Sequence, residues 1–504
     1  MNNTCESTET RDGYYHVRLP HLVQRPARKI APERMLLGGA AAADQKADTY
    51  DWDTVFAIRF ADANRSLAKP GATPSSFSAS DAGSGSSITG QFGAWQLSGG
   101  DGTLLHMTVP IQSGSVISPG KTNDLSGGVA TIEIQLMDLP QTPGANGTPH
   151  QVVPSTSQTV SVTNLTLPHV TDFLAKAVTQ ALLQQWFNSN LSAFTHTFST
   201  INLNEKADKA QFQWMKPTAF GWAVSAQGAA ADSVFGLLSM TSNRTKPNTM
   251  QISPNAIPPN QKSGFLIAQE RFLEELLLPG IHTLFDGATT ADFEVANDGT
   301  MIRNKNTVYM EEVELSGKTY RPSIQPGAAV IKLEANEIVV DLKKVVVDFS
   351  PGITIVMTYT CYSSIELAVN SKGEQILNYV EASPPVVDHN VEVASWVTWT
   401  EVAASVAAAL ITLGVGAWAK KAIEKVVLRV VAIVITLLVG ELIANIAAII
   451  QAVAEGDKDK IPPVTLMVAS ATDPITWPDS GDFLITSAGL NESLQFGGDP
   501  RFTN

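Results

Sequence analysis

Strict alternation of apolar and polar residues is the feature that most limits how this chain can fold. Residues 131–137 are an example. Ile132, Ile134 and Leu136 fall on one side of an extended chain there, and polar residues fall on the other. Three further segments also read as strands: residues 308–315, 337–349 and 353–360. A period of two predicts strands with one buried face. Such strands are typical of antiparallel sheets with one solvent-exposed face.

Two segments instead follow the period of an amphipathic α-helix. The first, residues 171–188, has Thr171 and Asp172 available to cap its start. Its apolar stripe consists of Phe173, Leu174, Ala177, Val178, Ala181, Leu182 and Trp186. The second, residues 264–278, meets Pro279, which should end or kink it. Long amphipathic helices together with one-sided strands predict an α+β protein, in which curved antiparallel sheets fold around the helices.

Length and charge limit the number of domains and the class of partner. A chain of 504 residues exceeds the roughly 250 to 300 residues that a single core supports, so two domains are expected. The 34 basic and 48 acidic residues give a net charge of −14, which opposes binding to nucleic acid. Cys5 and Cys361 are too few for a disulfide framework and lack the paired spacing of a zinc site.

No motif with a known catalytic mechanism stands out. The eight histidines do not fall at metal-ligand spacing. Residues 114–122 contain GKT, but one residue too many precedes it for a phosphate-binding loop. The adjacent carboxylates Glu274 and Glu275 diverge on a helix, which favours a solvated face. The sequence therefore predicts a protein that is not an enzyme, with no catalytic residue, no metal and no cofactor.

The composition shifts sharply in residues 402–453. Residues 402–419 carry no charge, four basic residues follow, and a second apolar run is interrupted by Glu441. This pattern predicts an apolar helical hairpin with a basic turn. Three interpretations remain open, in this order of preference: a hairpin packed in a soluble core, a lipid-facing element, and two transmembrane helices, since the length needed for a span, about 20 apolar residues, is only marginally met.

The lipid-facing interpretation identifies a set of candidate membrane contacts. Basic side chains beside an aromatic ring can meet anionic headgroups at the membrane interface. The candidates are Trp418, Lys420, Lys421, Lys425 and Arg429. An ordinary solvated turn is the alternative for the same residues.

The first 45 residues are basic but lack the pattern of a secretory signal peptide. Their six basic residues up to Arg34 are not followed by the apolar stretch of a secretory signal peptide. We therefore expect residues 1–45 to be a solvated or disordered arm, an interpretation favoured over contact with an anionic membrane. Synthesis in the cytoplasm is expected, and release would then need a leaderless route or lysis.

Four segments carry a resemblance to a known family. They are YDWDTVFAIRFADANRSL at residues 50–67, FQWMKPTAFGWAV at 212–224, FLIAQERFLEELLL at 265–278 and ITSAGLNESLQFGG at 485–498. Together they resemble the OrfX- and P47-related proteins encoded beside botulinum-type neurotoxin genes, which belong to the tubular lipid-binding (TULIP) superfamily. The resemblance covers residue 48 to the C-terminus. It implies an elongated TULIP-like fold, which we divide into domains 46–205 and 206–504, the second including the hairpin 402–453.

The resemblance also implies a function. It points to a non-enzymatic lipid- or membrane-interacting protein of the toxin-accessory kind. In TULIP proteins acyl chains lie in the seam between helix and sheet, although each residue of such a seam can equally be core. The candidates here are Phe173, Leu174, Val178, Leu182, Trp186, Phe265, Phe272 and Leu276.

Two other functions remain open at this point. One is a structural or interaction module that recruits a toxin or a related TULIP protein without bound lipid. The other is a membrane-perforating toxin that uses the apolar hairpin. The expected partners are thus lipid or an anionic membrane, a toxin, or a related protein, and not nucleic acid.

Overall fold

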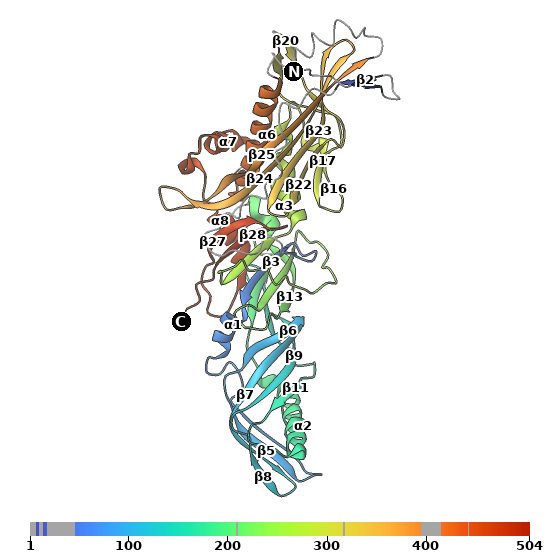
Figure 1. Ribbon diagram of the computed structural model, residues 1–504. Coiled ribbons are helices and arrows are strands. Elements are labelled where there is room, and N and C mark those ends of the chain that lie inside the picture. Colours follow the sequence, from blue (N-terminus) through green and yellow to red (C-terminus); the bar gives the residue numbers. More distant parts are fainter. Residues whose placement is uncertain are drawn as a thin grey trace. The chain divides into compact units, whose positions relative to one another are not determined.

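The computed structural model describes residues 7–9, 14–17, 46–207, 210–315, 318–394, 415–441 and 443–503 (Figure 1). The chain divides into two compact units. The α2 unit, named after helix α2 (Phe173–Ser189), contains the described residues within 43–268, 468–487 and 495–504. The α6 unit, named after helix α6 (Val415–Leu438), contains the described residues within 1–42, 269–467 and 488–494.

This division differs from the predicted boundary between residues 205 and 206. Strand β15 (Ser263–Ile267) pairs antiparallel with β3 (Thr54–Arg59), with Phe265 opposite Phe56. Strand β14 (Val234–Thr241) pairs with the other edge of β3. Residues 206–268 therefore complete the sheet that begins at residue 54, and the boundary falls after Ala268.

The α2 unit is built on a 16-stranded sheet. Its main path runs β26-β12-β10-β9-β7-β6-β13-β14-β3-β15-β28-β27, with β4, β5, β8 and β11 attached beside it. The remaining strands are β4 (Ser76–Asp81), β5 (Ser86–Phe92), β6 (Gln96–Gly102), β7 (Leu104–Ser118), β8 (Lys121–Asp124), β9 (Gly128–Pro140), β10 (Thr148–Pro154), β11 (Ser161–Thr166), β12 (Ser199–Leu203), β13 (Pro217–Ser225), β26 (Ile475–Thr476), β27 (Leu484–Leu490) and β28 (Leu494–Asp499).

The α6 unit contains a 10-stranded sheet and a separate two-stranded one. The main path runs β1-β2-β25-β24-β23-β22-β17-β16, with β18 and β21 beside it. Its strands are β1 (Ser7–Glu9), β2 (Tyr14–Val17), β16 (Phe293–Ala296), β17 (Met301–Asn304), β18 (Val308–Tyr309), β21 (Ser323–Ile324), β22 (Ala329–Glu334), β23 (Glu337–Ser350), β24 (Ile353–Val369) and β25 (Gln375–Ala394), and the small sheet is β19 (Val313–Leu315) with β20 (Lys318–Tyr320).

In the part of the chain that is described, helices are fewer than strands. They are α1 (Phe60–Leu67), α2 (Phe173–Ser189), α3 (Gln269–Leu276), α4 (Leu278–Ile281), α6 (Val415–Leu438), α7 (Ile446–Glu455) and α8 (Thr465–Thr472). The described residues also include six 3₁₀ turns: η1 (Leu191–Ala193), η2 (Ala210–Met215), η3 (His282–Leu284), η4 (Thr290–Asp292), η5 (Ile443–Asn445) and η6 (Lys458–Lys460). The protein is mostly sheet with some helices, which confirms the α+β class.

The alternating segments form the strands that they predicted. Ile132, Ile134 and Leu136 are buried in β9, while Glu133 and Gln135 are more exposed. Strand β23 covers the predicted residues 337–349, and β24 covers 353–360. Strands β9, β23 and β24 pair antiparallel with their neighbours, as one-sided alternation indicates. Residues 308–315 instead form two short strands, β18 and β19.

The N-terminal arm is partly structured, contrary to the expectation. Strands β1 and β2 pair with each other, and β2 pairs with β25, where Tyr14 lies opposite Ala394. The other arm residues, 1–6, 10–13 and 18–45, lie outside the described residues.

The second predicted helix is correct only in its later part. Residues 263–267 are the fully buried strand β15, and α3 begins at Gln269. Pairing with β3 overrides the helical period of Phe265 and its neighbours, because tertiary context outweighs local propensity. The predicted end at Pro279 is confirmed, since α3 stops at Leu276 and Pro279 lies in the first turn of α4.

The prediction that the basic residues of the hairpin form a turn is wrong. Helix α6 runs without interruption through Lys420, Lys421 and Lys425. Lysine, glutamate and alanine are strong helix formers, so nothing there breaks the helix. The chain turns instead at Gly440, whose φ of 68° suits glycine, before η5 and α7. The first predicted arm, residues 402–414, lies outside the described residues.

Helix α6 buries its apolar half within its own unit. Residues 430–435 are completely buried, and the helix packs against β24, β25, α3 and α7. In the described segments, no helix combines the length and the apolarity that crossing a membrane requires.

The packing of α4 on α6 gives a first testable prediction. A methyl group at Gly280 would lie 2.6 Å from Cγ2 of Ile433 in α6. We expect Gly280→Ala to lower the free energy of unfolding by about 1 to 3 kcal/mol through overpacking. Denaturant titration measures this free energy. The matched control is Gly489→Ala, because a methyl group at that position would have no atom within 4 Å. Equal midpoints for both variants would contradict this packing.

Candidate functional site

Helix α2 is positioned by its polar residues. Its start is capped by Asp172, whose side chain accepts a hydrogen bond from the Leu174 amide at 2.9 Å, as predicted. The helix contacts β4, β5, β7 and β11, and Figure 1 shows it beside β11. Three carboxamides one turn apart, Gln180, Gln184 and Asn188, bind the backbone at and just before β11.

These contacts replace a neighbouring strand for β11. Asn188 accepts from the amide of Val160 and donates to its carbonyl, both at 2.8 Å. Gln184 accepts from the amide of Val162 at 3.2 Å, and Gln180 donates to the Val162 carbonyl at 2.9 Å. An unpaired strand edge must find partners, so the carboxamides set the rotation of α2 about its axis. We call this set the amide ladder.

The predicted apolar stripe is therefore rotated. Phe173 is 84 % exposed and Leu174 is 50 % exposed, whereas Val178 is half-buried. Leu182 and Trp186 are buried as expected. The buried face of the helix consists of Ala175, Thr179, Leu182, Leu183, Trp186 and Phe187.

Trp186 belongs to a packed aromatic cluster. Its ring centroid lies 5.2 Å from that of Phe92 and 5.4 Å from that of Phe187. Trp95 packs edge to face on Phe187 at 5.6 Å. Edge-to-face contacts at these distances are typical of a well-packed core.

The other candidate lipid contacts are packed and are not brought together. Phe265 lies in the α2 unit and is 1 % exposed, with its ring 6.3 Å from that of Phe56. Phe272 and Leu276 lie in the α6 unit and are completely buried. Of the eight candidates, only Phe173 and Leu174 are exposed.

The candidate membrane contacts lie along α6, not on a turn. Lys425 Nζ lies 3.1 Å from Oε2 of Glu311, and Arg429 pairs with the other oxygen of the same carboxylate. The hydrogen bond from Arg429 is the main reason that the pKa of Glu311 falls below its usual value. The side chains of Trp418, Lys420 and Lys421 lie outside the described ones.

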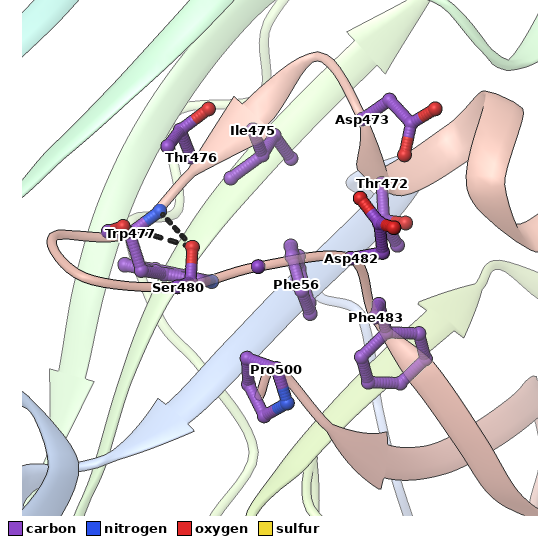
Figure 2. A pocket seen from close by; sticks show the side chains of 11 residues that line it. Phe56, Thr472, Asp473, Ile475, Thr476, Trp477, Ser480, Asp482, Phe483 and Pro500 are labelled. Atoms are coloured by element: carbon purple, nitrogen blue, oxygen red, sulfur yellow. Dashed lines mark hydrogen bonds between the residues drawn. The ribbon is translucent and has the colours of Figure 1, made fainter. Parts of the chain in front are cut away.

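The α2 unit also contains a cavity of about 250 Å³ (Figure 2). Phe56 from β3 contributes to it, and the rest comes from the end of the chain. Pairing of β26 with β12 and a hydrogen bond from the Asn202 amide to the Pro474 carbonyl hold this returning segment. The lining residues are Phe56, Thr472, Asp473, Ile475, Thr476, Trp477, Ser480, Gly481, Asp482, Phe483 and Pro500.

Hydrogen bonds hold the loop at residues 477–481, which lines this cavity. Ser480 Oγ accepts from the Trp477 amide and donates to the Trp477 carbonyl, as Figure 2 shows. The Gly481 amide donates to the Pro500 carbonyl at 2.8 Å.

Aromatic rings form one part of the cavity wall. The ring of Phe56 lies 5.7 Å from that of Trp477 and 5.3 Å from that of Phe483. The buried Nε1 of Trp477 has no hydrogen-bond acceptor in the described part of the chain. The sequence did not suggest this site, because Phe56 lies more than 400 positions before the other lining residues. The one available signal was the aromatic and acidic run at residues 473–483.

His196 is a buried titratable group in the same unit. Its Nε2 lies 3.3 Å from Oγ of Ser66, and its ring packs edge to face on Phe198. Burial lowers the pKa of His196 to about 4, and Asp479 opposes this effect only in part. No group of three metal-binding side chains occurs among the described residues.

The comparisons with known proteins identify the family. A family model described as OrfX-like, Protein OrfX2/OrfX3/P47, matches residues 49–498. The chain belongs to the OrfX-like family. This assignment confirms the resemblance found in the sequence. The family model groups the proteins OrfX2, OrfX3 and P47.

Similar proteins cover most of the chain. Protein OrfX3 of Paraclostridium bifermentans is 28 % identical and covers 90 % of this chain and 99 % of the relative. Protein OrfX3 of Clostridium botulinum (strain Kyoto / Type A2) is 27 % identical over 67 % and 76 % of the two chains. The solved structure of P47 from Clostridium botulinum A2 has a TM-score of 0.56 at 18 % identity, over 90 % of this chain and 98 % of P47. The OrfX-like chain therefore shares the P47 fold.

The aromatic cluster gives a second prediction. We expect Trp186→Ala to lower the free energy of unfolding by about 3 to 5 kcal/mol, because truncation leaves a cavity beside Phe92 and Phe187. Phe173→Ala, on the same helix, should change it by less than about 0.5 kcal/mol. Denaturant titration compares the two variants, and a small loss at Trp186 would show that α2 does not pack as described.

The buried histidine gives a third prediction. Between pH 6.5 and about 4 the unfolded chain protonates His196 while the folded chain does not, so stability falls as the pH is lowered. The part of the decrease in unfolding free energy that His196 causes should approach about 3 kcal/mol at pH 4. Denaturant titrations from pH 7.5 to 4 should show a shallower decline for His196→Gln. Parallel pH profiles for the two proteins would contradict this role.

Proposed function

We propose that this chain is a non-enzymatic accessory protein that contacts lipid through the exposed start of α2. A TULIP-like architecture is part of this proposal. Family membership supports the accessory role, and the exposed pair Phe173 and Leu174 is the observation that carries the lipid contact.

The exposed pair has the properties of a membrane anchor. Single exposed apolar side chains are common on protein surfaces, but these two are adjacent and lie at the capped end of a helix. Transfer of each side chain from water to an apolar phase is worth about 2 kcal/mol. Trp186 and the amide ladder hold the helix, so insertion would cost little conformational entropy.

Charge adds little to this contact. Lys176 is exposed on the next turn, but Asp172 lies beside the pair and the whole chain carries a net charge of −14. Binding should therefore be driven by apolar burial, with weak dependence on salt. This differs from an electrostatic contact through α6, where Glu311 already pairs with two of the candidate cations.

The burial of the same residues bears on two other functions. The packed states of Leu182, Trp186 and Phe272 favour a solid module that recruits a partner protein without enclosed lipid. A membrane-perforating toxin would have to expose residues 430–435, which are completely buried. The first alternative is therefore the runner-up.

Flotation with liposomes tests the proposal. We expect Phe173→Ser/Leu174→Ser to reduce the bound fraction at least tenfold, since about 4 kcal/mol of apolar transfer is lost. The matched control is Leu104→Ser/Leu139→Ser, because these leucines are 37 % and 40 % exposed in the same unit. The control should float like the wild-type protein.

Two results would count against lipid contact at α2. Equal flotation of all three proteins would place any membrane contact elsewhere. No flotation of the wild-type protein would favour the recruiting module. Lys420→Gln/Lys421→Gln in the same assay tests the remaining candidate contact on α6.

A further inference from the structure

The part of the α2 unit that carries α2 has few charged residues. Residues 70–200 contain two lysines, Lys121 and Lys176, no arginine and six acidic residues. The whole chain of 504 residues has 34 basic and 48 acidic residues, so this segment is poor in charge and above all in positive charge. An anionic membrane surface attracts a protein mainly through clustered lysines and arginines. Residues 70–200 therefore lack what an electrostatic membrane contact requires.

Uncharged hydroxyl groups are common on the surface around α2. They come from β4 and β11, which α2 contacts, and from the residue before its N-cap. Examples of exposed residues are Ser76, Ser78, Ser80, Thr163, Thr166 and Thr171. Such groups are well hydrated, and they are not attracted to lipid headgroups by charge.

The exposed face of α2 continues from the apolar pair with small side chains. Ala177 and Ala181 follow Phe173 at one-turn spacing, and both are exposed. Lys176 is the one charged residue among the 17 residues of the helix. A bilayer that meets this face is therefore held chiefly by the two large side chains, Phe173 and Leu174.

The affinity that this pair can supply is marginal. Transfer of both side chains out of water corresponds to a dissociation constant on the order of 1 mM. Reversible, marginal binding of this kind is also seen for a protein held by a single acyl chain. Insertion into a tightly packed bilayer costs additional free energy, because the headgroups must be separated to admit a phenylalanine ring. Neither positive charge nor further large apolar side chains offset that cost on α2.

We infer that α2 selects loosely packed, strongly curved bilayers and does not select anionic headgroups. The inference rests on the proposed lipid contact at Phe173 and Leu174, and it names the kind of membrane that this contact recognises. Strong curvature spreads the headgroups of the outer leaflet and exposes hydrocarbon between them. The ring of Phe173 enters such a gap without separating the headgroups, so the marginal transfer energy is enough for binding.

Flotation with neutral vesicles of two sizes tests this inference. Small sonicated and large extruded vesicles are both made of dioleoylphosphatidylcholine and are compared at equal lipid surface. We expect the bound fraction to be about tenfold higher on the small vesicles. Phosphatidylserine added to the large vesicles should change the bound fraction by less than about twofold, since Lys176 lies close to Asp172 in the chain.

Three results would overturn the inference. Equal binding to both sizes, or a larger response to phosphatidylserine than to curvature, would do so and leave the lipid contact at α2 intact. No flotation with any of these vesicles would overturn the proposed lipid contact together with the inference.

Two variants test whether α2 is the selecting element. Ala177→Leu/Ala181→Leu adds apolar surface to the exposed face, so it should bind large vesicles nearly as well as small ones. The matched control is Ala177→Gln/Ala181→Gln, which adds side chains of similar size without apolar character and should keep the preference for small vesicles. Circular dichroism checks that both variants fold. An undiminished preference in the leucine variant, or one that persists in Phe173→Ser/Leu174→Ser, would overturn the inference.

Discussion

The amide ladder between α2 and β11 is the constraint on which the rest of the α2 unit depends. A strand edge without a neighbouring strand must satisfy its backbone groups, and Gln180, Gln184 and Asn188 do so. Their one-turn spacing fixes the rotation of the helix. That rotation places Leu182 and Trp186 in the core and leaves Phe173 and Leu174 outside. The residues available to a lipid are thus decided by polar contacts elsewhere on the helix.

The C-terminal segment that returns to the α2 unit is the second feature that shapes this unit. Residues 468–487 and 495–504 rejoin the α2 unit, where Thr476 pairs with Thr200. This return brings Trp477 and Phe483 against Phe56 and forms a cavity that no single segment could provide. The cavity therefore depends on the return of the C-terminal segment to β12 and β3.

Much of the fold could be predicted from the sequence, but little of the candidate site. The period of two in β9 and β24 reports burial on one face, so these strands were predictable. Strand β15 was not, because Phe265 and its neighbours are buried on both faces and mimic a helical stripe. Likewise, the amide ladder could not be predicted, because a glutamine facing water and a glutamine bound to a strand edge give the same sequence pattern. The turn predicted at Lys420 was wrong, because residues 417–429 contain no glycine or proline that would break the helix.

Native mass spectrometry of the purified protein, followed by solvent extraction, tests the central claim most directly. If the helices of both units close on their own side chains and lipid is met only at the surface, the chain should appear at its bare mass. Extraction should then yield no lipid in stoichiometric amount. A phospholipid or fatty acid retained at one per chain, and released only on unfolding, would contradict this account. It would show that an acyl chain is enclosed in the interior of the protein.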